Sequence, residues 1–498
     1  MNVNPITRLD YPDLDVIRIE DTYYMVSTTM HFMPGCEILQ SFDLVHWEHV
    51  TYVYETLDHT DAQQLKSGQN IYGQGMWAAS LRYHEGRFYI CFVANDTRKT
   101  YLYTSKKIDG PWKKQLIEGF YHDGSLLFDE DGRNYIVYGN DEIWITELNE
   151  DLTAPKKDGL HRLLVSDHKN PELGYEGSHI QKINGYYYIF LVHSLRDRWM
   201  RTEACFYSDS LEGEFTGGDV LCDDRGYCGQ GVAQGGIVDT PDGKWYAMLF
   251  QDSGAVGRIP ILLPVTWKDH FPVFGQNGHV PEEIEVHSTR PGYIYQPLVG
   301  SDDFCNGLLP RWQFNHDPDP RYYHLDALQG TYTITTREVC TELTQAVNTL
   351  TQRMSYPSCA AEVTVDASAL KEGDVAGLCA LQSCYAAIGI TKHHGKYEVL
   401  MLDKKEDGIL DMTERTVVES HQMDFRLEAD FCNMKDEARC YYRVNKGDWL
   451  PIGTVHKLYF KLDHFTGCRF GLFCYAAEET GGSACFRDFK YYDVDEIS

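Results

Sequence analysis

Apolar and aromatic residues recur in short runs along roughly the first half of the chain, and each run follows a turn. Five copies of a turn followed by an aromatic-rich strand begin at Asp21, Gly86, Gly132, Gly185 and Gly243. The runs are short and helical periodicity is scarce, which indicates antiparallel β-structure. Copies of roughly 45–65 residues have room for about four strands each, as in propeller blades. The pattern therefore predicts an all-β fold that begins with a five-bladed β-propeller.

Each copy also has one residue at a near-constant distance ahead of its tyrosine. Counting back twelve residues from Tyr89, Tyr135, Tyr188 and Tyr246, and eleven from Tyr24, gives Trp77, Asp123, Glu176, Gln234 and Asp13, respectively. These residues stand just ahead of the apolar runs that we expect to form the innermost strand of each blade. Because inner strands line the central channel of a propeller, we expect the five side chains to meet at one end of it.

The pattern changes beyond residue 275. A stretch rich in Gly, Pro and Glu at 276–300 predicts a linker. After it, evenly spaced short strands resume without the turn-aromatic repeat, which is typical of a β-sandwich. The expected organisation is a propeller domain with the functional site over 1–275, the linker, and a sandwich over 301–498.

Composition narrows the range of partners. The 498 residues are enough for two domains, and 45 Lys and Arg against 74 Asp and Glu give a net charge of −29. That charge argues against nucleic acid or an anionic membrane as a partner. No run approaches the roughly 18 apolar residues of a membrane span. Fifteen cysteines without a CxxC pair or a signal-like N-terminus favour free thiols, and we expect a cytoplasmic protein.

Three of the five channel residues, Asp13, Asp123 and Glu176, are carboxylic acids. Acids that converge in an enclosed place serve mainly for proton transfer or for binding a cation. Hydrolysis of a glycosidic bond needs one protonated carboxyl and one ionised carboxylate, and Trp77 offers an apolar wall for a sugar face. Oxygen ligands for Ca²⁺ are the competing use, but no EF-type loop or His cluster accompanies these acids.

At this point several motifs together resemble glycoside hydrolase family 43. The propeller half carries them at Asn4–Pro5, Asp10–Arg18, Thr28–Gly35, Ser41–Trp47, Met76–Ala78, Asp123–Leu126, Glu176–His179 and Val256–Arg258. The second half, with Arg311–His316 and Leu343–Gln352, looks like the concanavalin-like sandwich of the family's β-xylosidase and α-L-arabinofuranosidase members.

The resemblance implies roles for particular residues. Asp13 matches the family's general base, Glu176 its general acid, and Asp123 the third acid, which orients the general acid. We expect Asp123 to keep Glu176 protonated by like-charge repulsion. Arg258 sits where the family places an arginine near the bound sugar. The remaining candidates for contact with substrate are Trp77, Met30, His31 and Gln234.

A metal site stays open at this stage. Many family members have a His tied to an axial metal ion where this chain has Gln234. An amide oxygen can bind Ca²⁺ but cannot act as an imidazole. The chemistry itself needs no cofactor, and a structural Ca²⁺ on the propeller axis remains a possibility.

The sequence thus predicts an inverting exo-glycosidase that releases xylose or arabinose from xylo-oligosaccharides or arabinose-bearing oligosaccharides. Its partner would be that oligosaccharide, and a homo-oligomer is possible. One alternative is a carbohydrate-binding propeller without catalysis. Another is an endo-acting arabinan hydrolase, which needs an open cleft. A sandwich packed on the propeller rim would wall the channel into a pocket and so favour exo action.

Overall fold

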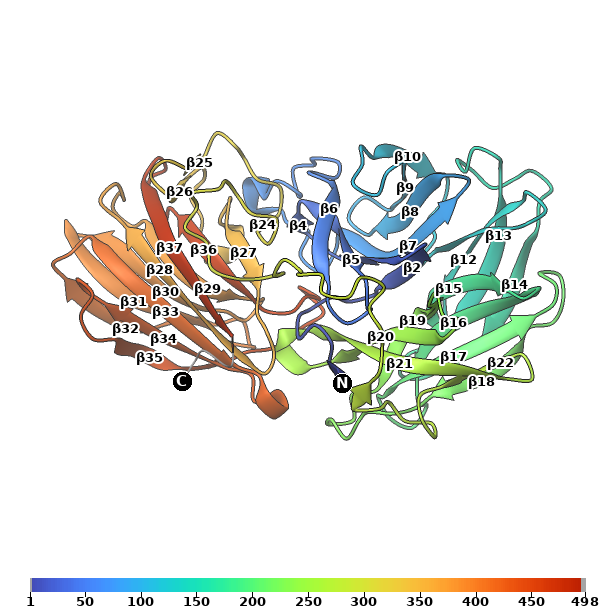
Figure 1. The fold of residues 1–498 in the computed structure, drawn as a ribbon. Helices are drawn as coiled ribbons and strands as arrows, with labels where there is room; N and C mark the ends of the chain where they lie inside the picture. The colour runs from blue at the N-terminus through green and yellow to red at the C-terminus, as the bar shows by residue number, and fades with distance from the viewer. Residues whose placement is uncertain (1, 494–498) are drawn as a thin grey trace.

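The computed structural model describes residues 2–493, which form two β-domains side by side (Figure 1). The propeller has five antiparallel four-stranded sheets, so the predicted five blades are confirmed. From the first blade to the fifth, inner strand first, the strands are β2 (Asp15–Ile19), β3 (Thr22–Ser27), β5 (Gly35–Ser41), β6 (Glu48–Tyr54); β7 (Met76–His84), β8 (Arg87–Ala94), β9 (Lys99–Ser105), β10 (Lys113–Ile117); β11 (Ser125–Phe128), β12 (Asn134–Asn140), β13 (Glu142–Leu148), β14 (His161–Ser166); β15 (Glu176–Ile183), β16 (Tyr186–Ser194), β17 (Arg201–Ser208), β18 (Thr216–Leu221); β19 (Val232–Asp239), β20 (Trp245–Asp252), β21 (Arg258–Lys268), β22 (Phe271–Phe274).

The inner strands close into a ring. Strand β2 contacts β7, β7 contacts β11, β11 contacts β15, β15 contacts β19, and β19 returns to β2. The repeat tyrosines lie on the second strand of each blade, as the sequence predicted. Because each inner strand is bonded on one edge only, its other edge and its first residues face the axis. Within the described chain no helix is long and apolar enough to cross a membrane.

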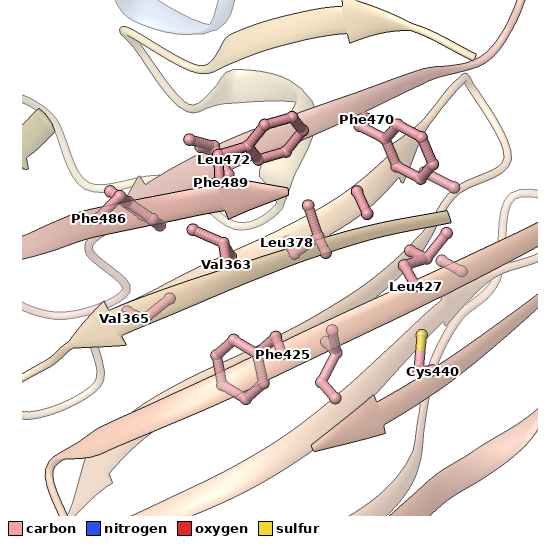
Figure 2. Packing of buried hydrophobic residues seen from close by; sticks show 14 of the residues in the cluster. Val363, Val365, Leu378, Phe425, Leu427, Cys440, Phe470, Leu472, Phe486 and Phe489 are labelled. Atoms are coloured by element: carbon pink, nitrogen blue, oxygen red, sulfur yellow. The ribbon is translucent and has the colours of Figure 1, made fainter. Parts of the chain in front are cut away.

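The second domain is a sandwich of an eight-stranded and a seven-stranded antiparallel sheet. The larger sheet runs β32 (Leu410–Val418), β31 (Lys396–Lys404), β30 (Ala386–His393), β29 (Val375–Leu381), β36 (Arg469–Tyr475), β27 (Leu350–Arg353), β24 (Gln313–Asn315), β4 (Phe32–Met33), and the smaller β25 (Tyr323–Asp326), β26 (Thr331–Thr335), β37 (Ser483–Asp493), β28 (Ser358–Asp366), β33 (Gln422–Asp430), β34 (Glu437–Arg443), β35 (Leu450–Lys457). Alternate residues of the two sheets meet in one apolar core, where Leu378 and Leu472 pack near Val363 and Phe425 (Figure 2). The predicted sandwich is therefore confirmed.

Short elements complete the chain. Strand β1 (Asn2–Val3) pairs with β23 (Glu283–Ile284) in the segment that joins the two domains. The remaining elements are the 3-10 turns η1 (Lys66–Gly68), η2 (Gly254–Val256), η3 (Leu343–Gln345) and η4 (Cys432–Met434).

The two domains share a sheet and a network of buried polar contacts. Strand β4 of the propeller half pairs with β24, so it extends the larger sheet of the sandwich. The carboxylate of Asp10 accepts the backbone N–H of Arg258 at 2.7 Å and that of Gly467, in the sandwich, at 2.9 Å. A side chain at 467 is excluded, because its Cβ would stand 2.1 Å from the carbonyl oxygen of Val256. One propeller carboxylate thus fixes a sandwich loop against the strand that carries Arg258.

Three buried histidines meet at the same interface. The His31 ring centroid lies 4.9 Å from that of His316 and 5.9 Å from that of His464, and His464 stacks on Tyr72 at 3.9 Å. Burial, the largest cause, lowers the pKa of His31 and His316 well below the usual value and that of His464 to about 3. Positive groups add to the effect, with Arg469 acting on His31 and Lys404 on His464.

This cluster predicts a loss of stability in mild acid. Histidines in the unfolded chain take up protons near pH 6.5 while the buried rings stay neutral, so stability is complete above pH 6.5 and falls as pH falls below it. For His464 the loss between pH 6.5 and pH 5 amounts to about 2 kcal/mol of unfolding free energy. We expect His464→Phe, which keeps a ring against Tyr72, to flatten the dependence of Tm on pH. The exposed His287, replaced by Gln, is the control; equal slopes in both variants would contradict the assignment.

Candidate active site

The five residues selected by the repeat lie at the starts of the inner strands. Asp13 and Asp123 precede β2 and β11, Glu176 opens β15, and Trp77 and Gln234 are near the starts of β7 and β19. Pairing shifts by a bulge at this end of β7, β15 and β19. The backbone φ is positive at Asp13 (51°), Asp123 (48°) and Gln234 (67°), a region that side chains disfavour. Repeated bulges and strained residues at one end of a ring are typical of a functional site.

Asp13 is held by two donors on the fifth blade. Its Oδ1 accepts Nη1 of Arg258 at 2.7 Å and Nε2 of Gln234 at 3.0 Å. Gln234 is itself fixed, because its backbone N–H donates to the buried carboxyl of Glu203 at 2.7 Å. Arg258 is 2% exposed and packs 3.9 Å from the ring centroid of Phe465. A buried carboxylate paired with a guanidinium and an amide is oriented in one direction.

The other two acids form a cluster with a histidine. Nε2 of His122 lies 3.6 Å from Oδ2 of Asp123 and 3.5 Å from Oε2 of Glu176. Asp123 Oδ2 also accepts the N–H of Gly177 at 2.9 Å, and Glu176 Oε2 accepts the amide of Asn140 at 2.7 Å. The third acid and the proposed general acid are therefore coupled through one imidazole.

The sequence analysis expected Asp123 to keep Glu176 protonated, but the pKa values of the cluster indicate a different distribution of protons. Burial, together with Glu176 and Asp13, raises the pKa of Asp123 to about 6. Burial also raises the pKa of Glu176, but the neighbouring imidazolium of His122 outweighs it, so that pKa lies below the usual value. Burial lowers the pKa of His122, yet Asp123 and Glu176 overcome this and raise it to about 9. In the ligand-free protein His122, rather than repulsion by Asp123, decides the state of Glu176.

A pocket of about 700 Å³ opens above these groups. It is lined by Trp77, His122, Asn140, Glu172, Leu173, Glu176, Trp199, Arg201, Gln230, Asp252, Gly254, Met434, Phe460, Leu462 and Phe465. The last four belong to the sandwich, and Phe465 lies 5.5 Å from Trp77, centroid to centroid. The second domain therefore walls the channel, as expected, with these four side chains.

A second buried ion pair completes the floor. Nε of Arg201 donates to Asp252 at 2.8 Å, and the same carboxylate stands 3.7 Å from Nε of Arg258. Arg258 Nε and Nη2 and Arg201 Nη1 are buried without a hydrogen-bond partner among residues 2–493. Unpaired buried donors are costly, so a site of this kind suits a ligand rich in hydroxyl groups.

Of the predicted site residues, Trp77 and Glu176 line the pocket. The others are buried behind its lining, namely Asp13, Asp123, Arg258, Gln234, Met30 and His31. Met30 is 1% exposed, and its backbone bridges to Met76. His31 is fully buried within the histidine cluster at the domain interface, so we assign it to domain packing instead of substrate binding.

The propeller axis below the site is occupied by a guanidinium. Arg82, on β7, donates to the Asp15 carboxylate at 2.7 Å, to the Leu126 carbonyl at 2.8 Å, and to Ser125 and Ile180 at 2.7 and 3.2 Å. These are oxygens that an axial Ca²⁺ would use. Because a cationic side chain already bonds them, the residues on this part of the axis do not suit a metal ion.

Comparison with known proteins agrees with this geometry. The family model described as glycosyl hydrolases family 43 matches residues 3–272, and the β-xylosidase C-terminal concanavalin A-like domain matches 301–492. The chain belongs to glycosyl hydrolase family 43. It is therefore a glycoside hydrolase, and the predicted family and concanavalin-like sandwich are confirmed.

Several proteins are similar to this chain along most of its length. A bifunctional GH43-CE protein of Bacteroides eggerthii is 42% identical with a TM-score of 0.93, covering 100% of this chain, which spans 64% of that protein's length. A β-xylosidase of Formosa agariphila is 27% identical over 99% of this chain and 89% of its own. A non-reducing end α-L-arabinofuranosidase of Bacteroides ovatus is 24% identical over 82% and 79%, respectively.

The sequence analysis missed several residues of this family 43 site. Arg82 could have been found from the sequence, because it lies five residues after Trp77. Five residues after the other four channel residues stand Arg18, Phe128, Gln181 and Asp239. Together with Arg82, these residues line the opposite mouth of the channel. Asn140, Arg201 and Asp252 lie on second or third strands, where no comparable count selects them. Phe465 comes from the other domain and had no signal at all.

Removing the sandwich wall should weaken substrate binding. We expect Phe465→Ala to lower kcat/KM by about tenfold, mainly through KM, because the ring supports ground state and transition state alike. Phe465→Tyr, which keeps the ring over Arg258, should retain most of the activity. Steady-state kinetics on an aryl pentoside measure this, and unchanged KM in Phe465→Ala would show that the wall does not touch substrate.

Proposed function

We propose that this enzyme is an inverting, exo-acting hydrolase that releases xylose or arabinose from xylan-derived oligosaccharides. The observation that carries the proposal is that two carboxyl groups at the same end of the channel have unlike environments, with Glu176 lining the pocket and Asp13 buried just behind its lining. Asp13 is ion-paired with Arg258, whereas Glu176 belongs to a cluster that shares protons. Two carboxyl groups whose surroundings separate their protonation are what acid–base hydrolysis of a glycoside needs.

In this mechanism the sugar lies between Trp77 and the floor of the pocket. Glu176 protonates the glycosidic oxygen as the bond to the anomeric carbon breaks, while Asp13 removes a proton from the attacking water on the opposite face. Asp123 orients Glu176 through the neighbouring Gly177 N–H and His122. The partnerless Nη1 of Arg201, which lines the pocket, would bind a sugar hydroxyl.

The substrate class rests on relatives and on pocket shape. Relatives along nearly the whole chain carry names of β-xylosidases and xylosidase/arabinosidases. A pocket closed on one side by the sandwich favours a chain end over an internal bond, which supports exo over endo action. The complete acid set supports catalysis over simple sugar binding. A cytoplasmic site of action and a homo-oligomer remain predictions from the sequence.

The acid is tested by leaving-group dependence. We expect Glu176→Gln to lower kcat on xylobiose by about 10²- to 10⁴-fold, because general acid catalysis is lost. The loss should be much smaller on aryl glycosides, whose leaving groups need little protonation. Kinetics on the two substrate types measure this, and Asn140→Ala is the matched control that removes a neighbour of the same oxygen. If Glu176→Gln lowers kcat by the same factor on both substrate types, Glu176 is not the acid.

We also propose that hydrolysis needs no metal ion, because Arg82 supplies the axial positive charge. Rates on nitrophenyl β-xyloside and nitrophenyl α-L-arabinofuranoside should be unchanged by a chelator and by added Ca²⁺. Measuring both substrates side by side also ranks the two pentoses. A chelator-induced loss that Ca²⁺ restores would overturn the proposal.

A further inference from the structure

The imidazole of His122 occupies a place that the proposed acid–base pair does not explain. Its Nε2 is almost equidistant from Asp123 and Glu176, at 3.6 and 3.5 Å, and its ring lies 5.8 Å from Trp77 on the pocket wall. It stands on the side of Glu176 that faces the other acid. A side chain placed only to bind sugar hydroxyls would not need to contact both carboxylates.

The charges around His122 account for its position. Asp13 is paired with Arg258, and Asp252 is paired with Arg201, so these four groups balance one another. What remains is His122 with Asp123 and Glu176, where a protonated imidazole lies between two carboxylates. Near pH 7 in the ligand-free protein the proton of the trio is on His122, because its pKa is raised to about 9, whereas the pKa of Asp123 is about 6 and that of Glu176 lies below its usual value.

The trio also offers three possible metal-ligand atoms within 4.8 Å of one another. A protonated imidazole cannot ligate a cation. Because His122 is protonated in the ligand-free protein and lies between the two carboxylates, we assign no metal to the trio.

We propose that His122 stores the proton that Glu176 later donates to the glycosidic oxygen, an inference that rests on Glu176 being the general acid. In the ligand-free enzyme the proton is on Nε2 of His122, and Glu176 is ionised and accepts a hydrogen bond from Asn140. Nε2 of His122 is itself buried, but the Glu176 side chain is 18% exposed and lines the pocket, so water in the open pocket solvates the carboxylate of this ion pair.

Substrate binding moves the proton. A sugar in the pocket displaces the water, and an ion pair that loses solvation converts to its neutral form. The N–H bond of the imidazolium breaks and an O–H bond forms on Oε2 of Glu176, with no change in total charge. Glu176 is thus protonated only once a sugar covers it.

The remaining steps balance. Glu176 gives this proton to the leaving oxygen, and Asp13 takes one from the attacking water. After the products leave, Asp13 releases its proton to solvent, and the neutral His122 takes one up from solvent. The cycle consumes one water per bond and needs no other reactant. His122 does not itself protonate the substrate; it is a positioning residue that holds the proton for Glu176.

The pH profile of kcat/KM on xylobiose tests this assignment. In His122→Gln, an amide remains near both acids but cannot hold a proton, so we expect the basic limb to move down by about one pH unit or more. In Asn140→Ala the ionised carboxylate of Glu176 loses a donor, so the basic limb should stay or move up. If the basic limb moves down in His122→Gln and does not move down in Asn140→Ala, the shift reflects proton storage and not general structural damage.

The outcomes distinguish this inference from the proposed function. If Glu176→Gln shows the expected leaving-group dependence but the basic limb is unmoved in His122→Gln, the storage role is wrong and the acid assignment stands. If Glu176→Gln lowers kcat by the same factor on both substrate types, the proposed function itself fails.

A second measurement uses the wild-type enzyme and so does not depend on a variant that folds. Nitrogen-15 NMR of labelled histidine side chains reports the charge of each ring at pH 7. We expect His122 to be an imidazolium in the free enzyme and neutral with a non-hydrolysable thio-linked xylobiose bound. A charged ring in both states would overturn the proposal.

Discussion

The guanidinium of Arg82 is the contact that holds the proposed catalytic acids in one frame. It starts from β7 and bonds oxygens on β2, β11 and β15. Asp13, Asp123 and Glu176 stand at or just ahead of the same three strands. A rigid planar cation with five donors suits this position better than a flexible ammonium. Because the strand pairing of a propeller closes within each blade, polar bonds between blades such as this one set their relative alignment.

The site above this bond separates two kinds of charge. On one side, Arg258 and Gln234 fix Asp13. On the other, His122 links Asp123 with Glu176, and the trio shares protons. The separation follows from the ring, since neighbouring blades deliver the partners of each acid from different directions. One end of the channel can therefore hold two carboxyl groups in unlike surroundings.

The sandwich domain forms part of the active site. Asp10 bonds the backbone of Arg258 and of Gly467, so the loop that bears Phe465 is fixed to the strand that bears the arginine. Phe465 then packs on Arg258 and near Trp77. Closing the pocket with aromatic rings removes water and strengthens the electrostatic interactions inside it. The domain interface and the pocket are thus parts of one arrangement.

The sequence by itself determined the five blades, the second domain and the ring of residues at the head of the inner strands. It could do so because strand periodicity and repeat spacing are local, and a closed ring turns a constant offset into a shared location. Tertiary structure alone decided how those residues are charged and partnered. The pKa directions of His122 and Glu176, the pairing of Arg201 with Asp252, and the burial of His31 depend on groups far apart in the chain. Phe465 shows the limit most clearly, because its distance from Arg258 is fixed by the packing of two domains, and no local pattern encodes that packing.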